Sequence, residues 1–335
     1  MRLLRNLCFL AMMVASLPLV AGFLGSLHPA FDSFAHFRIH LAAVMILCAL
    51  PLLLSALRTE ALMALAFGVA ALATVREDFT FTGAFPAEDI SSQPVYRLMQ
   101  LNLRYDNAAV QDVMNLIERV RPDVITLQEV SSAWRANLGP LSETYPYNLI
   151  CPAPHGVFGV AIFSRQAFTE GAEKRCLDYG RMAVASFDFA GRSTDVVSLH
   201  LDWPWPAAQS SEIDGLVPVL SALGETALLG GDFNATPWSA AVHRVAVAGG
   251  LTTMPSPGPT WLYRALPPVI DKLGLPIDQV MSKGDLRIRS ARLGPRVGSD
   301  HLPVLVEFSF GSGSAVPAER ETSTATFRQT AALRR

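Results

Sequence analysis

The chain has 335 residues, of which 50% are hydrophobic and only 17% are charged. Soluble domains carry about 25% charged residues, so either the core is very large or part of the chain lies in lipid. A chain with a mean hydropathy of +0.31 buries apolar surface readily, which excludes disorder for most of its length. The formal net charge of −2 implies no basic surface for clamping nucleic acid.

Three apolar stretches precede residue 76 and predict membrane spans at about residues 7–27, 39–57 and 61–75. A spanning helix needs about 20 apolar residues and at least about 17, so the first two stretches qualify and the third is short. We therefore assign residues 1–76 to a transmembrane region. A cleaved signal peptide is the alternative for the first stretch, but further apolar stretches follow it immediately.

The arginines favour one orientation by a thin margin. Arg2 and Arg5 favour a cytoplasmic start. With three spans, three arginines (Arg2, Arg5, Arg58) would lie inside and two (Arg38, Arg76) outside. We expect a multi-pass protein of a bacterial-type inner or plasma membrane, with everything after Arg76 on the outer, periplasmic or extracellular, side.

The histidines and cysteines raise two further questions, a metal site in the first loop and a disulfide in the soluble part. His28, His36 and His40 cluster in the first loop, where a solvated interfacial loop is a better interpretation than a metal site. Cys151 and Cys176 lie in the soluble part. An outer location would permit a disulfide between them, but the sequence leaves this pairing open.

The rest of the chain divides into three parts. Residues 77–94 are polar with two prolines and are predicted to be a linker, whereas residues 311–335 lack periodicity and are predicted to be a disordered tail. Residues 95–310 alternate strand and helix patterns, with some consecutive strands lacking a helix between them. This order predicts an α/β domain with mixed sheets rather than a purely parallel one.

The elements of this domain are predicted from the periodicity of the apolar residues, from helix-capping residues and from residues that end helices. Helices are expected at about 107–120, 211–223 and 239–248. Strands are expected at 95–105, 124–127, 147–151, 159–164, 182–189, 195–200, 227–231, 277–281 and 302–310.

Polar residues stand repeatedly at the ends of these apolar strands. A buried carboxylate is costly unless it is paired or binds a cation. Taken singly, Asn102 fits a helix cap, Glu129 an exposed turn residue and His200 a satisfied core histidine. We call these polar positions at the strand ends stations. Together the six stations predict one polar site on which the strand ends converge. They are Asn102, Glu129, His200, Asp232 with Asn234, Asp278, and Asp300 with His301.

These stations, in this order, resemble the endonuclease/exonuclease/phosphatase superfamily, which includes deoxyribonuclease I-like enzymes, abasic-site endonucleases and neutral sphingomyelinases. The resemblance covers residues 95–310. The motifs that carry it are Met99-Gln100-Leu101-Asn102, Pro122-Asp123-Val124-Ile125-Thr126-Leu127-Gln128-Glu129, Ser198-Leu199-His200, Gly231-Asp232-Phe233-Asn234, Pro276-Ile277-Asp278 and Gly298-Ser299-Asp300-His301. The motif after Ile277 departs from the family at Gln279, where aromatic residues or histidine are common.

The resemblance implies a four-layer α/β/β/α sandwich of two mixed sheets, with a metal site at one edge. By this similarity Glu129 is the principal metal carboxylate, with Asn102 and Asp300 beside it. Asp232 and Asn234 would orient the attacking water or hold a second ion. The implied reaction is hydrolysis of a phosphodiester with Mg²⁺ or Mn²⁺, because carboxylate and amide oxygens suit a hard cation.

The same resemblance implies roles for the remaining polar residues. Asp278 would orient His301, fixing its tautomer and favouring its charged form. His200 would match the second histidine of the deoxyribonuclease and sphingomyelinase branches. The assignment of acid and base between His200 and His301 stays open, and Asp232 also competes as the base.

Three tryptophans are candidates for substrate contact. Trp203 and Trp205 follow His200 in a Trp-Pro-Trp-Pro run, and Trp261 precedes the Asp278 station. Exposed tryptophans stack on bases or insert at a lipid interface, whereas buried indoles only stiffen loops. Nucleic acid is the first expected substrate. The alternative is a lipid head group, cleaved by a sphingomyelinase-like enzyme, or the substrate of another phosphatase of the same fold. A catalytically dead, membrane-anchored binding protein is the third hypothesis, and the intact polar set argues against it.

Overall fold

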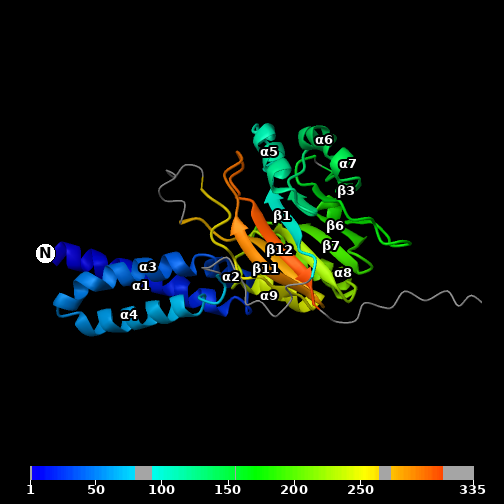
Figure 1. The fold of residues 1–335 in the computed structure, drawn as a ribbon. Coiled ribbons are helices and arrows are strands. Elements are labelled where there is room, and N and C mark those ends of the chain that lie inside the picture. Colours follow the sequence, from blue (N-terminus) through cyan, green and yellow to red (C-terminus); the bar gives the residue numbers. More distant parts are fainter. Residues whose placement is uncertain (1, 80–92, 155, 264–272, 312–335) are drawn as a thin grey trace, which may run out of the picture.

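A computed structural model describes residues 2–79, 93–154, 156–263 and 273–311. An N-terminal helical bundle extends away from a larger domain of strands and helices, and the N-terminus lies at the far end of the bundle (Figure 1). Most of the predicted linker (80–92) and of the predicted tail (312–335) lies outside the described residues.

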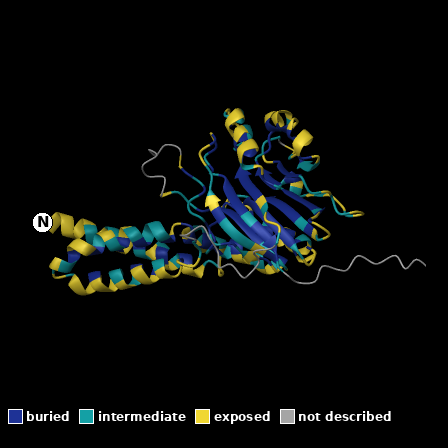
Figure 2. Cartoon of the chain, viewed as in Figure 1, coloured by how far each residue is buried: buried dark blue, intermediate teal, exposed yellow. Residues whose placement is uncertain are grey.

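The bundle is built from the apolar stretches found in the sequence. Its elements are α1 (Arg2–Ala21) with η1 (Gly22–Leu24), α2 (Pro29–Ala35), α3 (Arg38–Ala49) with η2 (Leu50–Leu54), and α4 (Arg58–Ala73). Leu19 and Met45 are buried between the helices, whereas Leu17 is 72% exposed and Leu54 is 97% exposed. Exposed residues line the outside of the bundle along its whole length (Figure 2). An apolar exterior of this extent is typical of a surface that contacts something other than water.

One described helix, Arg2–Leu24, is long and apolar enough to cross a membrane. The pair Pro29–Ala35 and Arg38–Leu54, bent by 61°, counts as a second span only if both helices are taken as one. Helix α4 has 16 residues, or about 24 Å at 1.5 Å per residue, which is short of the ~30 Å hydrocarbon core. The structure thus supports one N-terminal apolar helix clearly, and three spans stay a prediction.

The larger domain contains two mixed six-stranded sheets. Sheet one has the order β11-β12-β1-β2-β4-β3 and sheet two the order β5-β6-β7-β8-β10-β9. The strands of sheet one are β1 (Tyr96–Asn102), β2 (Val124–Gln128), β3 (Tyr147–Cys151), β4 (Val160–Ser164), β11 (Leu286–Leu293) and β12 (Val304–Phe310). Those of sheet two are β5 (Arg175–Leu177), β6 (Met182–Asp188), β7 (Ser193–His200), β8 (Ala227–Asp232), β9 (Thr252–Thr253) and β10 (Asp278–Lys283).

The sheets pack face to face, and helices cover their outer faces. A central core joins side chains of both sheets, such as Leu98 and Val306 with Val196 and Val280. Helices α5 (Val110–Val120), α6 (Ser132–Leu138) and α7 (Leu141–Thr144) pack on sheet one, and α8 (Gln209–Ser221) and α9 (Ala240–Gly249) pack on sheet two. The predicted four-layer α/β/β/α sandwich is confirmed.

The sequence did not predict the short elements β5, β9, α6 and α7. It also did not predict β11, which is longer. Among the described strands, β11 is an edge strand whose one partner is β12. Its arginines, at 287, 289 and 292, dilute the hydrophobic signal because an edge strand has solvent on one side.

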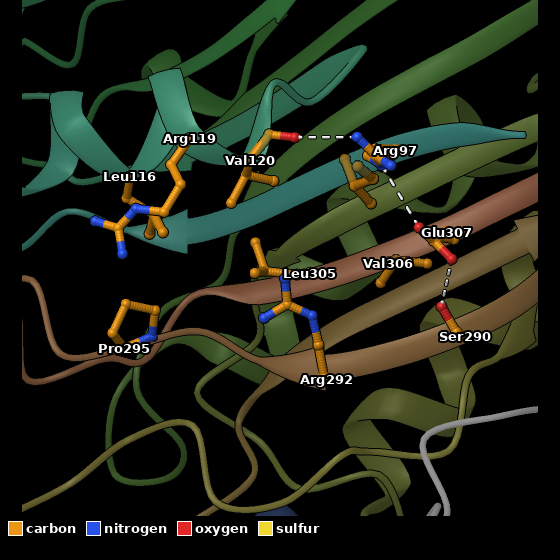
Figure 3. Close-up of a pocket in the computed structure, with 11 residues that line it drawn as sticks. Arg97, Leu116, Arg119, Val120, Ser290, Arg292, Pro295, Leu305, Val306 and Glu307 are labelled. Atoms are coloured by element: carbon orange, nitrogen blue, oxygen red, sulfur yellow. Dashed lines mark hydrogen bonds and ion pairs between the residues drawn. The ribbon is translucent and has the colours of Figure 1, made fainter.

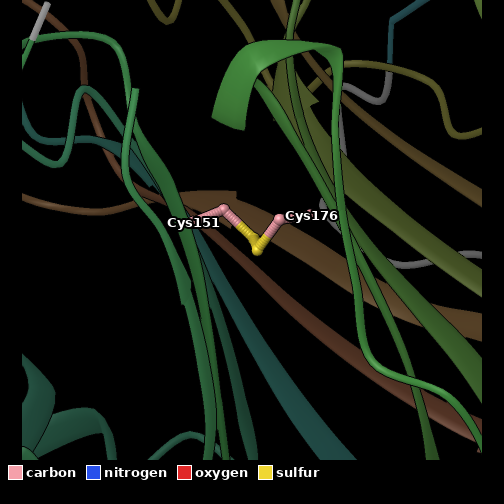
Figure 4. Close-up of a disulfide and its surroundings, with 2 residues drawn as sticks. All are labelled: Cys151 and Cys176. Atoms are coloured by element: carbon pink, nitrogen blue, oxygen red, sulfur yellow. A yellow bond between two sulfur atoms is a disulfide. The ribbon is translucent and has the colours of Figure 1, made fainter. Parts of the chain in front are cut away.

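A disulfide joins the two sheets, which resolves the pairing that the sequence left open. Cys151 ends β3 in sheet one and Cys176 lies in β5 of sheet two, with 5.4 Å between their Cα atoms (Figure 4). The bond therefore ties together edge strands of the two layers.

Strand direction brings the polar stations to one end of the sandwich. β1 runs parallel to β2 in sheet one, and β7 runs parallel to β8 in sheet two, so each pair has its carboxyl ends at one edge of its sheet. The hydrogen bond from Asn102, which ends β1, to Asp232, which ends β8, shows that these two edges meet. β10 runs antiparallel to β8 and begins there, with Asp278 opposite Asp232. The start of β12 lies at the same end, because Val304 is opposite Gln100 of β1.

Candidate active site

A buried aspartate–histidine pair lies at the centre of this edge. His301 Nδ1 donates to Asp278 Oδ2 over 2.8 Å, and both residues are buried. The pair fixes the tautomer of the imidazole and leaves Nε2 directed towards Asp232 Oδ2, 3.6 Å away. Burial lowers the pKa of His301, but the negative charges of Asp278 and Asp232 outweigh it and raise the pKa to about 10. His301 is therefore set to carry a proton.

Asp232 links three other residues of the site. Its Oδ1 accepts from the backbone N–H of Asn234 and its Oδ2 accepts from Asn102 Nδ2, both over 2.8 Å. His200 Nε2 lies 3.7 Å from Asp232 Oδ2. Burial raises the pKa of Asp232 to about 7, against the positive charge of His301, which lowers it. This carboxyl group is thus close to neutralisation unless further positive charge is present.

Asn102 and Glu129 meet where β1 and β2 end. Asn102 Nδ2 donates to Glu129 Oε1 over 3.1 Å, and Glu129 Oε2 accepts from the backbone N–H of Tyr105 over 2.8 Å. The parallel register of β1 and β2, with Asn102 opposite Gln128, places the two side chains together.

The backbone at the site is strained at two of these residues. Glu129 has a φ of 54° and Asn234 a φ of 48°, in the left-handed region that costs non-glycine residues of order 1–3 kcal/mol. Surrounding contacts must hold such residues in place. For Asn234, the side chain donates to the carbonyl of Leu201 over 2.9 Å.

His200 differs in charge from His301. Burial, followed by the nearby positive charges of Arg181 and His301, lowers the pKa of His200 to about 3. Arg181 in turn lies 3.5 Å from Asp202 Oδ1 and 3.7 Å from Glu212 Oε1. The site therefore holds one charged and one neutral imidazole, both close to Asp232 Oδ2.

A cavity of about 570 Å³ opens onto these groups. Glu129, His200, Asp232, Asn234, Asp300 and His301 line it, together with a set of aromatic side chains at Phe158, Tyr179, Trp203 and Trp261. Trp203 is 61% exposed. Trp205 is 52% exposed and lines a neighbouring cavity between the domain and the helical bundle.

A buried polar network beneath the site was not found from the sequence. Gln100 Nε2 donates to Gln128 Oε1 over 2.8 Å and to Asp278 Oδ1 over 2.9 Å, and Gln128 Nε2 donates to Ser198 Oγ over 3.0 Å. Gln279, the departure from the family motif, donates to the carbonyl of Ala235 over 2.9 Å. Because these glutamines lie within strands, only the pairing of the two sheets reveals what they contact.

Arg181 is a second residue that sequence reasoning missed. It lines the cavity, as His200 and Asp202 do. Tyr179-Gly180-Arg181 follows β5, which was itself not predicted. A lone arginine in a short turn carries no distinguishing pattern.

A different cavity, of about 390 Å³, lies where β1 begins, at Arg97 and Leu98. Its single carboxylate, Glu307, lies 3.5 Å from Arg97 and accepts from Ser290 over 3.0 Å (Figure 3). This cavity therefore lacks the convergent oxygens of the first.

The residues of the first cavity fit a hard divalent cation. One atom each of Asp232, Asp278 and His301 lies within 4.8 Å of the others. However, Asp278 is already held by His301 and Gln100. The carboxylates that line the cavity itself are Glu129, Asp232 and Asp300, and an oxygen has lone pairs left for a cation even where it accepts one hydrogen bond. Burial raises the pKa of Asp232, and a bound cation would favour the charged form of this carboxylate.

Known structures share the fold of this domain. D. rerio TDP2 complexed with a single-strand DNA product is 18% identical, with a TM-score of 0.52, and the match covers 64% of this chain and 99% of that one. An endonuclease/exonuclease/phosphatase from Bacteroides vulgatus is 16% identical, with a TM-score of 0.52 and 65% and 100% coverage. One from Beutenbergia cavernae is 20% identical, with a TM-score of 0.50 and 65% and 72% coverage. These identities show the fold alone.

A search of curated proteins finds no match. The model of the Endonuclease/Exonuclease/phosphatase family matches residues 99–301, a range that includes every polar station described above. Members of this family hydrolyse phosphoester bonds. Because the match spans more than half of the sequence, the chain belongs to the endonuclease/exonuclease/phosphatase family.

Proposed function

We propose that this protein is a membrane-anchored, Mg²⁺- or Mn²⁺-dependent phosphodiester hydrolase. The observation that carries the proposal is the contact of Asp232 with both imidazoles and with Asn102, in a cavity that also contains Glu129. This arrangement combines a held proton donor, a proton acceptor and carboxylate oxygens that line one cavity.

Glu129, Asn102 and Asp300 are the residues proposed to hold the ion. When bound, the ion neutralises phosphate charge and stabilises the developing transition state. Asn102 would have to present its amide oxygen, which now accepts from the backbone N–H of Arg104 over 2.8 Å.

The other residues perform the proton transfers. Asp232, held by Asn234, takes a proton from the attacking water as its oxygen forms the new bond to phosphorus. His301, kept charged by Asp278, gives a proton to the leaving oxygen as the old bond breaks. His200 stays neutral and contacts the phosphate or the water from the other side of Asp232.

Nucleic acid is the first proposed substrate. Trp203, Trp261, Tyr179 and Phe158 surround the cavity, and aromatic faces of this kind stack on unpaired bases. Arg181 lies at the same wall and can contact a phosphate.

A lipid head group is the second candidate, and one contact favours it. The carbonyl of Trp205 accepts from Ser33 Oγ over 3.1 Å, so the loop that carries Trp203 lies against the helical bundle. If the bundle is in a membrane, this loop lies near the lipid surface, where tryptophan is enriched.

Two features support the proposed anchoring and its outer side. The outward leucines of the bundle, such as Leu17 and Leu54, are exposed in the isolated chain and would be covered by lipid. The Cys151–Cys176 disulfide is of a kind that persists outside the reducing cytosol.

The test uses the full chain in detergent, incubated with Mg²⁺ and with plasmid DNA, RNA or sphingomyelin micelles. Glu129→Ala should lower cleavage about a thousandfold, since a lost metal contact removes several kcal/mol of transition-state stabilisation. Glu143→Ala, at an exposed glutamate of α7, is the matched control.

Each outcome decides between the hypotheses. DNA or RNA cleavage that falls as salt rises selects the nuclease, whereas cleavage of sphingomyelin alone selects the lipid enzyme. A folded protein that cleaves none of the three and gives no heat on Mn²⁺ titration would refute the hydrolase and leave the binding protein.

A further inference from the structure

The connection between the first two apolar helices lies against the back of the active-site loops. We refer to residues 32–40, which end α2 and begin α3, as the clamp segment. Helix α2 lies at the junction between bundle and domain (Figure 1). Asp32 is 7% exposed, and its two carboxylate oxygens accept from the backbone N–H groups of Ala240 and Ala241 over 2.7 and 2.9 Å.

Asp32 thereby satisfies the first turn of α9. The helix has its own cap, because Ser239 Oγ accepts from Val242 N over 3.2 Å. The N–H groups of Ala240 and Ala241 have no partner within the helix, and a carboxylate is favoured at a helix N-terminus. Without Asp32 these two donors would lose their bonds at a place where Ala241 is buried.

Two further contacts hold the loop between Asn234 and α9. The backbone N–H of Thr236 donates to His36 Nδ1 over 3.3 Å, and Trp238 Nε1 donates to the carbonyl of Ala35 over 2.6 Å. Thr236 is two residues from Asn234, whose φ of 48° needs support from its surroundings. The clamp segment supplies that support from behind the loop.

The same segment reaches two more loops of the site. Ser33 Oγ donates to the carbonyl of Trp205 over 3.1 Å, in the loop that also carries Trp203. His40 Nε2 donates to the carbonyl of Leu273 over 2.8 Å, five residues before Asp278. Within nine residues, the clamp segment thus contacts three loops of sheet two that carry site residues.

The clamp segment is also fixed to the rest of the bundle. Arg38 is 7% exposed, and its Nη2 donates to the carbonyl of Gly22 at the end of α1 over 3.2 Å. Its Nη1 donates to Thr74 Oγ1 beyond α4 over 3.4 Å. A shift of the bundle is therefore transmitted to the clamp segment.

We propose that the clamp segment is a positioning element of the active site, with Asp32 as its main residue, so that the anchor sets the geometry of the Asn234 loop. The consequence for catalysis rests on the proposed function. A fragment that begins after the anchor would lack these bonds and would expose the surface that Asp32 and His36 cover.

The experiment compares full-length wild type with Asp32→Ala in lipid nanodiscs by two measurements. Hydrogen exchange reports the protection of residues 234–241 without any substrate. Hydrolysis of bis(p-nitrophenyl) phosphate with Mn²⁺ reports kcat and KM. Asp112→Ala, at an exposed aspartate of α5, is the matched control.

We expect Asp32→Ala to speed exchange over residues 234–241 about tenfold. It should lower kcat about 10- to 100-fold, as small displacements far from the reacting atoms do, and leave KM and the Mn²⁺ affinity within about twofold of wild type. Unchanged exchange would overturn the clamp. Faster exchange with unchanged kcat would overturn its positioning role.

Two provisions keep the outcomes distinct. If wild type hydrolyses nothing, the proposed function fails, while the exchange measurement still decides on the clamp. If Asp32→Ala does not fold, Trp238→Phe removes the indole donor to Ala35 and keeps an aromatic ring at this position. This milder variant should change exchange and kcat in the same direction by about threefold to fivefold, in line with the loss of one hydrogen bond, and no change in either would again refute the proposal.

Discussion

The two ends of the sheet sandwich use charge in opposite ways. Where β1 ends, Asp232, Asp278 and His301 are buried and contact one another. Where β1 begins, Arg97 and Glu307 form an ion pair of 3.5 Å with side chains that are 52% and 45% exposed. At the first end the charged groups are buried and interact strongly in fixed positions. At the second end the charged groups are solvated by water.

This contrast indicates that the cavity at the end of β1, and not the one where β1 begins, is suited to catalysis. Charges that are buried and coupled shift each other's pKa values and keep one geometry, but exposed charges are screened and keep their ordinary properties. The contrast predicts large effects of substitution at one end and small effects at the other.

The largest effect is expected for Asp278→Asn. The negative charge of Asp278 raises the pKa of His301, and its Oδ2 holds Nδ1 of the ring over 2.8 Å. An asparagine removes that charge and can hold the wrong tautomer, so kcat should fall by about three to four orders of magnitude. The measurement is the rate of phosphodiester hydrolysis at saturating substrate and metal, with Asp112→Asn as the control. A loss of less than tenfold would contradict the role given to this pair.

A substitution of Glu212 is expected to have an intermediate effect, on the free energy of unfolding. Glu212 lies on α8, and its Oε1 is 3.7 Å from the guanidinium of Arg181. Burial, and then the neighbouring Asp178, raises the pKa of Glu212 to about 8, although Arg181 lowers it. The folded state therefore holds a proton that the unfolded chain releases near the ordinary glutamate pKa of 4.5. Stability is consequently greatest below pH 4.5 for this group and is lost as pH rises from about 4.5 to 8.

Glu212→Gln tests this pH dependence. Glutamine keeps an oxygen for the backbone N–H of Asp202, which donates to Glu212 Oε2 over 2.6 Å, and it carries no proton to lose. The variant should be more stable than wild type by up to about 5 kcal/mol at pH 8.5, with a difference that shrinks towards pH 5. Urea unfolding at both pH values measures it, and an equal difference at both would refute the assignment.

Much of the site could be predicted from the sequence because strand ends are local features. Asn102, Glu129, His200, Asp232, Asn234, Asp300 and His301 all line or contact the cavity, and Asp278 holds His301 from behind. The parallel and antiparallel order of the strands then brings them together. Their individual roles stay predictions until they are tested.

Other features depend on contacts between distant parts of the chain. The pairing of Gln100 with Asp278 crosses from one sheet to the other, and no residue near Gln100 indicates it. His36 is a clearer case. The sequence placed it in a solvated loop, but it is 4% exposed and contacts Thr236, 200 residues away. Burial of a loop by another domain leaves no periodic pattern in either segment.

The smallest effect is expected at the other end of the sandwich. Arg97→Ala removes an ion pair with Glu307 whose two side chains are about half exposed, and such pairs contribute about 0–1 kcal/mol. Phosphodiester hydrolysis should stay within about twofold of wild type and the free energy of unfolding within about 1 kcal/mol, because this cavity lacks a set of convergent carboxylates among its described residues. A tenfold loss of activity would show that substrate also reaches the beginning of β1. The coupled end of the sandwich would then not be sufficient for the reaction.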